Sequence, residues 1–153
     1  MRPSVEEQLL GTCRVLEKVV APCVADPFAR TILDGLVANL RMLTGALPAL
    51  PGFLREDNVA TLKLLAALRP ALPESLTARI DAAANVPEPD IADGAALEAR
   101  NQALRALLAE AVCVPGLDAA QHAAIVAHMS ARASRVPMRY VPTAAPKPAT
   151  AKT

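Results

Sequence analysis

Residues 26–47 read DPFARTILDGLVANLRMLTGAL, and this stretch has the clearest helical pattern in the chain. At about 100° per residue, its large apolar side chains fill one half of a helical wheel, and Arg30, Asp34 and Arg41 fall on the other half. An apolar arc this wide needs neighbouring helices on more than one side. The stretch therefore predicts a helix at the centre of a bundle.

Local signals predict where this helix begins and ends. Asp26 can accept from the free amides of the first turn, and Pro27 suits the first helical position because a donor there would have no partner. Gly45 and Pro48 are expected to end the helix.

Similar signals divide the remaining chain into helices and connectors. Ser4 and Glu7 form a capping box at the start of the first helix, and Asp118 and Gln121 form another before the last. We expect helices over 4–20, from 56–58 to 69, 74–84, 94–112 and 118–136, a connector over 46–52 and an exposed loop over 85–94. The third helix is expected to bury Val59, Leu62, Leu65 and Leu68.

Composition supports an all-α fold. The 153 residues are 53% hydrophobic but only 2% aromatic, which favours closely spaced helices with aliphatic side chains between them. We predict a single-domain bundle of five to six helices over residues 1–136, with four long helices forming the core. Residues 137–153 are rich in Pro, Ala, Thr and Lys and are predicted to be a flexible, disordered tail.

Charge and cysteine usage limit the compartment and the partners. The net charge is +1, with acidic and basic residues interleaved, which does not favour binding to nucleic acid or to anionic membranes. The sequence shows no signal-peptide pattern and no apolar run of about 18 residues, so we expect no membrane span. Three widely spaced cysteines fit reduced thiols. We therefore expect a cytoplasmic protein.

Three polar residues fall on apolar helical faces and are the candidate buried or ligand-contacting residues: Asn39, Asn101 and His122. A buried amide without a partner costs about 1 to 3 kcal/mol, so each asparagine must find one. Gly35 lies beside Asn39 on the wheel, which suggests that another helix approaches there. We expect that helix to contain Asn101. These polar residues either fix the register of the packed helices or provide a polar contact in a ligand pocket.

A second candidate site lies at the end of the last helix. Arg132, Arg135, Arg139 and Tyr140 cluster there. Cations suit a helix C-terminus, and Arg and Tyr are also frequent anchors in protein interfaces. The cluster is either an ordinary helix end or a docking site for a partner.

Catalytic and metal-binding motifs are absent from the sequence. It contains no H-E-x-x-H, E-x-x-H or C-x-x-C spacing, and no G-x-S-x-G, P-loop or G-x-G-x-x-G motif. Cys13 lies on an apolar stripe, where thiols are usually inert. We expect no catalytic residue, no metal and no cofactor, and so a protein that is not an enzyme.

Four segments resemble a family of small bacterial helical proteins of unknown function. They are RPSVEEQLL (residues 2–10), LVANLRML (36–43), LEARNQAL (97–104) and RVPMRY (135–140). Genes of that family often lie beside those for aminoglycoside-phosphotransferase-like kinases and acyl-CoA dehydrogenases. The chain departs from the family pattern over residues 70–89, a proline-rich segment that is longer than expected for the family. The resemblance implies an accessory role near acyl-CoA metabolism and assigns no catalytic residue.

Two hypotheses follow. The first is a non-catalytic accessory or protein-interaction subunit, with a phosphotransferase-like kinase or an acyl-CoA dehydrogenase as partner and a homodimer as a further expected assembly. The alternative is a small-ligand binding protein that holds an acyl or aromatic group in an apolar pocket between helices.

Overall fold

The computed structural model describes residues 3–138, and every regular element in this part of the chain is helical. The predicted all-α class is confirmed, whereas most of the predicted tail lies outside the described residues. The α-helices are α1 (Val5–Val15), α2 (Pro27–Ala46), α3 (Leu50–Leu68), α4 (Glu74–Ala84), α5 (Gly94–Val112) and α6 (Ala119–Arg135).

The predicted helix starts are confirmed where a side chain caps them. Ser4 and Glu7 form the capping box of α1, and the Asp26 side chain accepts from the amide of Ala29 at the start of α2. At α6, the backbone N–H of Gln121 donates to Asp118 Oδ1 at 2.7 Å, and the backbone N–H of Asp118 donates to Gln121 Oε1 at 2.8 Å. These bonds satisfy amides that have no partner inside the helix.

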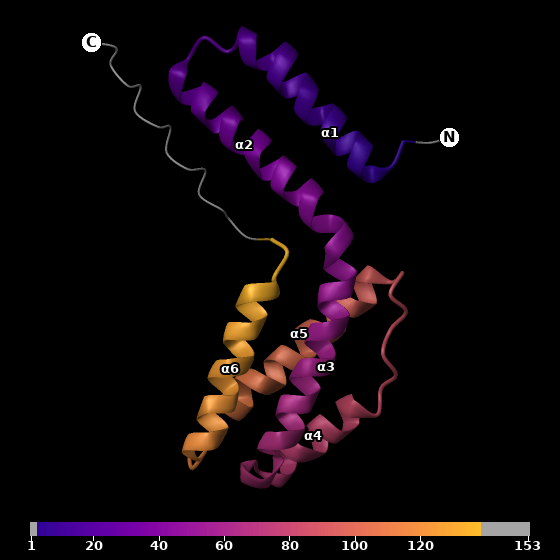
Figure 1. Ribbon diagram of the computed structural model, residues 1–153, viewed down its shortest axis with the longest axis vertical. Helices are drawn as coiled ribbons and strands as arrows, with labels where there is room; N and C mark the ends of the chain where they lie inside the picture. The colour runs from indigo at the N-terminus through magenta and orange to yellow at the C-terminus, as the bar shows by residue number, and fades with distance from the viewer. Residues whose placement is uncertain (1–2, 139–153) are drawn as a thin grey trace, which may run out of the picture.

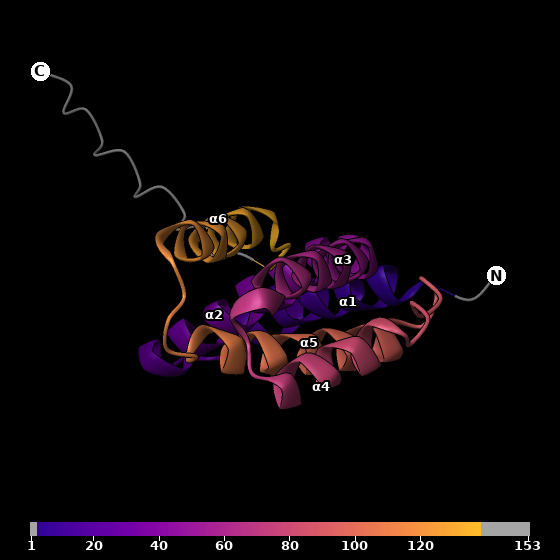
Figure 2. The ribbon, with the colours of Figure 1, turned by 90° about the horizontal axis from the view of Figure 1, so that it is seen from below.

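Helix α3 is the hub of the larger part of the molecule. It lies between α6 on one side and α5 with α4 on the other, and it contacts all three (Figure 2). Aliphatic side chains from all four helices form the main core: Leu64, Leu65, Leu68, Leu76, Ile80, Leu104, Leu107, Leu108, Ala111 and Ile125. We refer to α3–α6 as the body.

Helices α1 and α2 form an antiparallel hairpin that extends beyond the body (Figure 1). Between them the chain forms a π-helical segment, Leu16–Val20, and a 3-10 turn, Ala21–Cys23. The helical run ends near Pro22 as expected, but the α-helix itself already ends at Val15. Arg41 donates to both carboxylate oxygens of Glu17 at 2.8 Å, which links α2 to the π-helical segment.

The prediction that residues 26–47 form a central helix is wrong. Helix α2 packs against α1 and the adjoining turns, and its Phe28 side of the wheel faces solvent. Phe28 is 75% exposed, Leu36 54% and Ile32 49%. The pattern identified an apolar face correctly, but one chain supplies only one neighbouring helix to this segment.

The prediction of a connector over residues 46–52 is also wrong in part. A 3-10 turn, Leu47–Ala49, joins α2 to α3, and α3 already begins at Leu50. Pro51 lies in the first helical turn, where its missing N–H costs no hydrogen bond. The earlier start adds Phe53 and Leu54 to the buried side of α3. Val59, which the pattern predicts to be buried, is 57% exposed because it lies more than 100° from Leu54 and Leu65 on the wheel.

Candidate functional site

Three polar residues of α3 are completely buried. Asp57, Asn58 and Thr61 each have 0% exposure. At about 100° per residue, they fall in the same arc as Leu54 and Leu65, so the side of α3 that faces the other helices of the body is polar in its middle part. Burying a charge and two polar groups is costly unless they are hydrogen-bonded. Their partners therefore define the most unusual region of the molecule.

Asn101 of α5 is the centre of this polar cluster. It is 2% exposed, and its Nδ2 donates to Asp57 Oδ2 at 2.8 Å and to Asn58 Oδ1 at 3.0 Å. Arg132 of α6 donates from Nε to the same Asp57 oxygen at 2.9 Å. The other oxygen, Asp57 Oδ1, has no hydrogen-bond partner among the described residues. One carboxylate thus joins three helices.

The acidic loop between α4 and α5 also reaches this cluster. Asn58 Nδ2 donates to Glu88 Oε1 at 3.0 Å and approaches the backbone oxygen of Leu97 at 3.4 Å. Arg100 Nε lies 2.9 Å from Glu88 Oε2, which is ion-pair distance, although the N–H direction falls short of a hydrogen bond. The loop is mainly exposed, as predicted, but Glu88 anchors it.

His128 of α6 lies beside the cluster and is only partly buried. Its Nε2 is 3.4 Å from Thr61 Oγ1, a long contact whose donor depends on the imidazole tautomer. Burial lowers the pKa of His128 below its ordinary value of 6.5, and the nearby charges of Arg135 and Arg132 lower it further, while Asp57 opposes the shift. Burial therefore favours the neutral imidazole.

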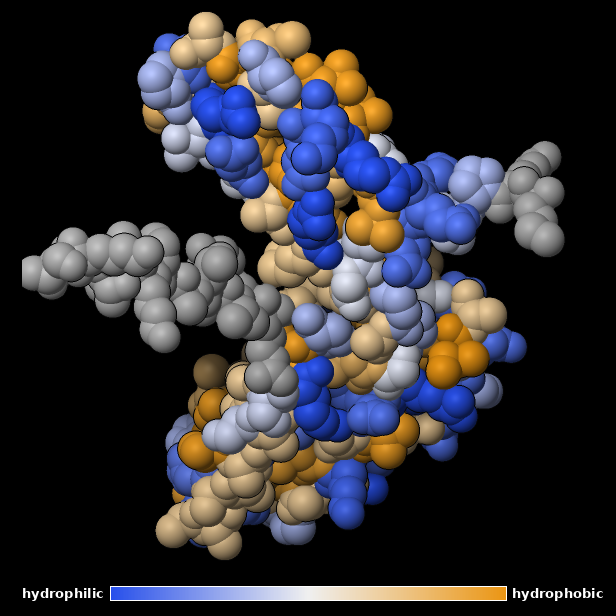
Figure 3. All heavy atoms as spheres, turned by 45° about the horizontal axis from the view of Figure 1, so that its top comes forward, coloured by the Kyte–Doolittle hydropathy of each residue, from blue (hydrophilic) through white to orange (hydrophobic). Residues whose placement is uncertain are grey.

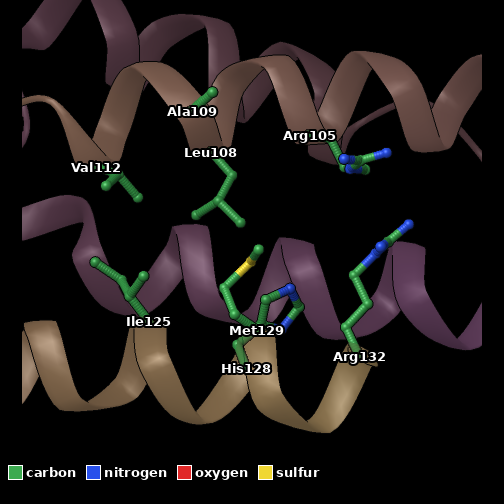
Figure 4. A pocket seen from close by; sticks show the side chains of 8 residues that line it. All are labelled: Arg105, Leu108, Ala109, Val112, Ile125, His128, Met129 and Arg132. Atoms are coloured by element: carbon green, nitrogen blue, oxygen red, sulfur yellow. The ribbon is translucent and has the colours of Figure 1, made fainter. Parts of the chain in front are cut away.

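An apolar groove opens between α5 and α6, with a volume of about 360 Å³. Leu108 and Val112 project from α5 toward Ile125 and Met129 of α6 (Figure 4). The cationic and titratable groups of the groove are Arg105, His128 and Arg132, and the two arginines lie at one end of it (Figure 4). The groove thus combines an apolar wall with a positively charged end.

Of the three predicted buried polar residues, only Asn101 is buried. Asn39 is exposed on α2, so its predicted pairing with Asn101 is wrong. The two residues belong to different parts of the molecule, because α2 and α5 do not pack together. His122 is also exposed instead of buried, and its Nδ1 lies 2.8 Å from the Asp118 backbone oxygen in the first turn of α6.

The predicted docking residues have different surroundings. Arg132 is largely buried in the polar cluster, and its guanidinium carbon lies 5.5 Å from the centre of the Phe53 ring. Arg135 is more exposed and forms a 3.3 Å ion pair with Glu56. Arg139 and Tyr140 lie outside the described residues.

Sequence reasoning missed most of the polar cluster. The sequence pattern places Asp57 and Asn58 at the start of a helix, where polar residues are common, and so it does not indicate that they are buried. An earlier helix start would have revealed it, because Asp57, Asn58 and Thr61 then share a side with Leu54 and Leu65. The partners on α5 and α6 come from distant parts of the chain and leave no local pattern.

The described residues contain no group of three or more His, Cys, Asp or Glu side chains that could hold a metal ion. Within the same part of the chain, no helix is sufficiently long and apolar to cross a membrane. Comparisons with protein-family models, with curated proteins and with solved structures found no match.

Proposed function

We propose that this chain is a non-catalytic accessory subunit that assembles with other protein through its α1–α2 hairpin. The observation that carries the proposal is the exposed apolar side of the hairpin. Phe28, one of only two phenylalanines in the chain, is 75% exposed there, and Ile32 and Leu36 continue its side of α2. Contiguous apolar surface of this kind on a soluble protein usually marks an interaction site.

The polar cluster supports a structural role for the buried charges. Asp57, Asn58 and Asn101 bond to one another, and Arg132 neutralises the buried carboxylate. A connected network of this kind holds three helices in one register, which makes the body a rigid support for the hairpin. Apart from Asp57 Oδ1, the polar groups named here thus have structural partners.

The resemblance of the sequence directs the search for partners. We propose a phosphotransferase-like kinase or an acyl-CoA dehydrogenase encoded near this gene in a bacterial cytoplasm. The experiment is co-expression of the tagged chain with each neighbouring gene product, followed by affinity purification. A complex that survives washing supports the proposal, and no complex with any neighbour would refute the accessory role.

A matched pair of variants tests the part that the hairpin plays. Phe28→Glu combined with Ile32→Glu places charges on the exposed side of α2, and Val59→Glu places one on α3 at a similar exposure of 57%. Loss of the complex with the first variant and retention with the second is the expected result. Equal binding by both variants would exclude the hairpin as the docking element.

The α5–α6 groove supports a second candidate function, which is binding of a small apolar or aromatic carboxylate such as an acyl group. Leu108 and Met129 supply apolar walls, and the guanidinium groups of Arg105 and Arg132 suit the anionic end. A thermal-shift screen with fatty acids, aromatic acids and acyl-CoAs tests this. A ligand at 100 times its Kd stabilises the folded state by about 2.7 kcal/mol, which corresponds to roughly 5 to 10 °C for a chain of this size.

Arg105→Ala gives the specific control for the groove. Arg105 is exposed and forms no hydrogen bond or ion pair with the buried cluster in the described structure, so the fold should survive its removal. The shift should shrink in Arg105→Ala and persist in Arg55→Ala, which removes a similar charge on α3. A flat response of the unmodified protein to every compound would rule out this function.

A further inference from the structure

The exposed apolar residues of α2 form a single stripe. At about 100° per residue, Phe28, Ile32 and Leu36 fall within about 80° of one another. The side of α2 that packs on α1, marked by buried Val37 and Thr44, lies roughly 130° from the middle of this stripe on the wheel. The stripe therefore points past α1, and α1 does not cover it.

Helix α1 has an equivalent stripe. Val15 is 53% exposed and lies about 160° from buried Cys13 on the wheel. Val19, in the π-helical segment that follows, is 61% exposed. In each helix the stripe is displaced in the same rotational sense from the side that contacts the other helix. Because the helices are antiparallel, the two stripes lie on the same side of the hairpin.

These residues define one surface, which we call the hairpin face: Val15, Val19, Phe28, Ile32 and Leu36. Apolar residues gather along one side of the hairpin in Figure 3, next to a strongly polar surface. The body does not cover the hairpin face, since α2 runs into α3 through the 3-10 turn and the hairpin extends away from α4–α6 (Figure 1). Residues 139–153 contain only Tyr140 and Val141 as large apolar residues.

We infer that the hairpin face is covered by the same face of a second copy of this chain, so that two hairpins form an intermolecular four-helix bundle. The inference rests on the proposed role of the hairpin as the docking element and deepens it: the second copy covers the hairpin face, and an enzyme partner binds the paired hairpins. In such a bundle each helix gains the second neighbour that its wide apolar arc requires. A twofold axis makes the interface self-complementary.

The whole side of the hairpin approaches the size that a stable dimer needs. Helix α2 has 20 residues and the hairpin is two helices wide, so this side measures about 30 Å by about 20 Å, or roughly 600 Å² in projection, and Phe28 to Leu36 span about 12 Å of its length. Each partner of a standard stable interface buries about 800 Å², to which side chains at the rim also contribute.

Charge also permits pairing of identical hairpins. Residues 3–49 carry four basic and five acidic side chains with the signs interleaved, so two copies do not repel one another. The hairpin face itself contains no charged residue. A partner of strongly acidic or basic character would find no complementary surface there.

Gly35 indicates where the two α2 helices cross. It lies beside Ile32 on the wheel, and a Cβ atom added to it would meet nothing within 4 Å. A glycine costs a helix interior about 1 kcal/mol relative to alanine, and the local structure of one chain offers no packing reason for it. A closely approaching helix from a second copy uses this absence of a side chain.

Light scattering of the purified full-length chain tests the inference directly. The expected mass is twice the 16.0 kDa of one chain, falling toward 16.0 kDa on dilution. Phe28→Glu with Ile32→Glu should give the single-chain mass at every concentration, while Val126→Glu, at a 64% exposed site on α6, should stay dimeric. Circular dichroism establishes that the variants keep their helices. A single-chain mass for the unmodified protein, or a dimeric mass for the double variant, would overturn the inference.

A cysteine cross-link tests the same geometry without disturbing the face. In a background with Cys23→Ser and Cys113→Ser, both at exposed sites, Gly35→Cys should form a disulfide-linked dimer under mild oxidation. Asp34→Cys, one residue earlier and on the charged side of α2, should remain uncross-linked. The reverse pattern would place the contact elsewhere. An unmodified chain that is monomeric and still captures an enzyme through Phe28 and Ile32 would refute self-association and leave the proposed function intact.

Discussion

Removing the Arg132 guanidinium should destabilise the protein by about 3 kcal/mol. Its Nε donates to Asp57 Oδ2 at 2.9 Å, and the Asp57 side chain is 0% exposed. Breaking a buried ion pair by deleting one partner costs about 3 to 5 kcal/mol, because the other charge stays in a medium of low dielectric constant. Arg132 is 20% exposed and Asn101 still donates to Asp57, so Arg132→Met should fall at the lower end.

Urea unfolding at one fixed chain concentration measures the effect. With a denaturant dependence of about 2 kcal/mol per molar urea, a loss of 3 kcal/mol lowers the midpoint by about 1.5 M. Arg135→Met is the matched control, since Arg135 pairs with Glu56 at the surface at 3.3 Å. Surface pairs contribute at most about 1 kcal/mol. A midpoint for Arg132→Met no lower than that of Arg135→Met would refute the assignment.

A double variant separates the ion pair from general packing. Asp57→Leu removes the charge that Arg132→Met leaves unpaired, and Asn101 keeps Asn58 as a hydrogen-bond acceptor. Replacing both members of a buried pair by apolar residues is often close to neutral. The double variant should therefore lose less unfolding free energy than the two single variants lose together. Strictly additive losses would show that Asp57 and Arg132 are not energetically coupled.

Three further changes have defined outcomes. Asn101→Ala should cost about 2 to 3 kcal/mol in urea unfolding because two buried acceptors lose a donor, and Gln102→Ala, which removes an exposed amide from the same helix, should stay within about 0.5 kcal/mol. Because the pKa of His128 is lowered in the folded state, the unfolded chain binds this proton at higher pH, and the unfolding free energy should fall as the pH drops below about 6.5. His128→Gln should reduce this pH dependence, and a pH profile identical to that of the unmodified protein would contradict the assignment. Asp118→Ala should lose about 1 kcal/mol through the α6 cap, measured by thermal unfolding.

The boundaries of several helices could be predicted because capping is local. Asp118 and Gln121 are three residues apart, so the sequence contains the whole interaction, and the same holds for Ser4 and Glu7. The start of α3 could not be predicted in this way, because it depends on more than a local cap. Pro51 resembles a helix breaker, and only the turn that precedes it makes it a first-turn residue.

The polar cluster could be predicted only in part. The position of Asn101 among leucines indicated that it faces inward, and it is buried. Its partner could not be inferred, because Asp57 and Asn58 are more than 40 positions away and their own burial depends on where α3 begins. Hydrogen-bond partners across a bundle are chosen by helix packing, which no local pattern records.

The sequence by itself determined that residues 26–47 form a capped helix with a wide apolar arc, since periodicity and capping depend on near neighbours. Only the tertiary structure decided what covers that arc. Within one chain, α1 covers one edge and the Phe28 side remains exposed, because α2 continues in line toward α3 and carries the hairpin away from the body. An amphipathic pattern specifies how much surface needs burial, and the packing of the remaining helices determines whether this chain or a second molecule provides it.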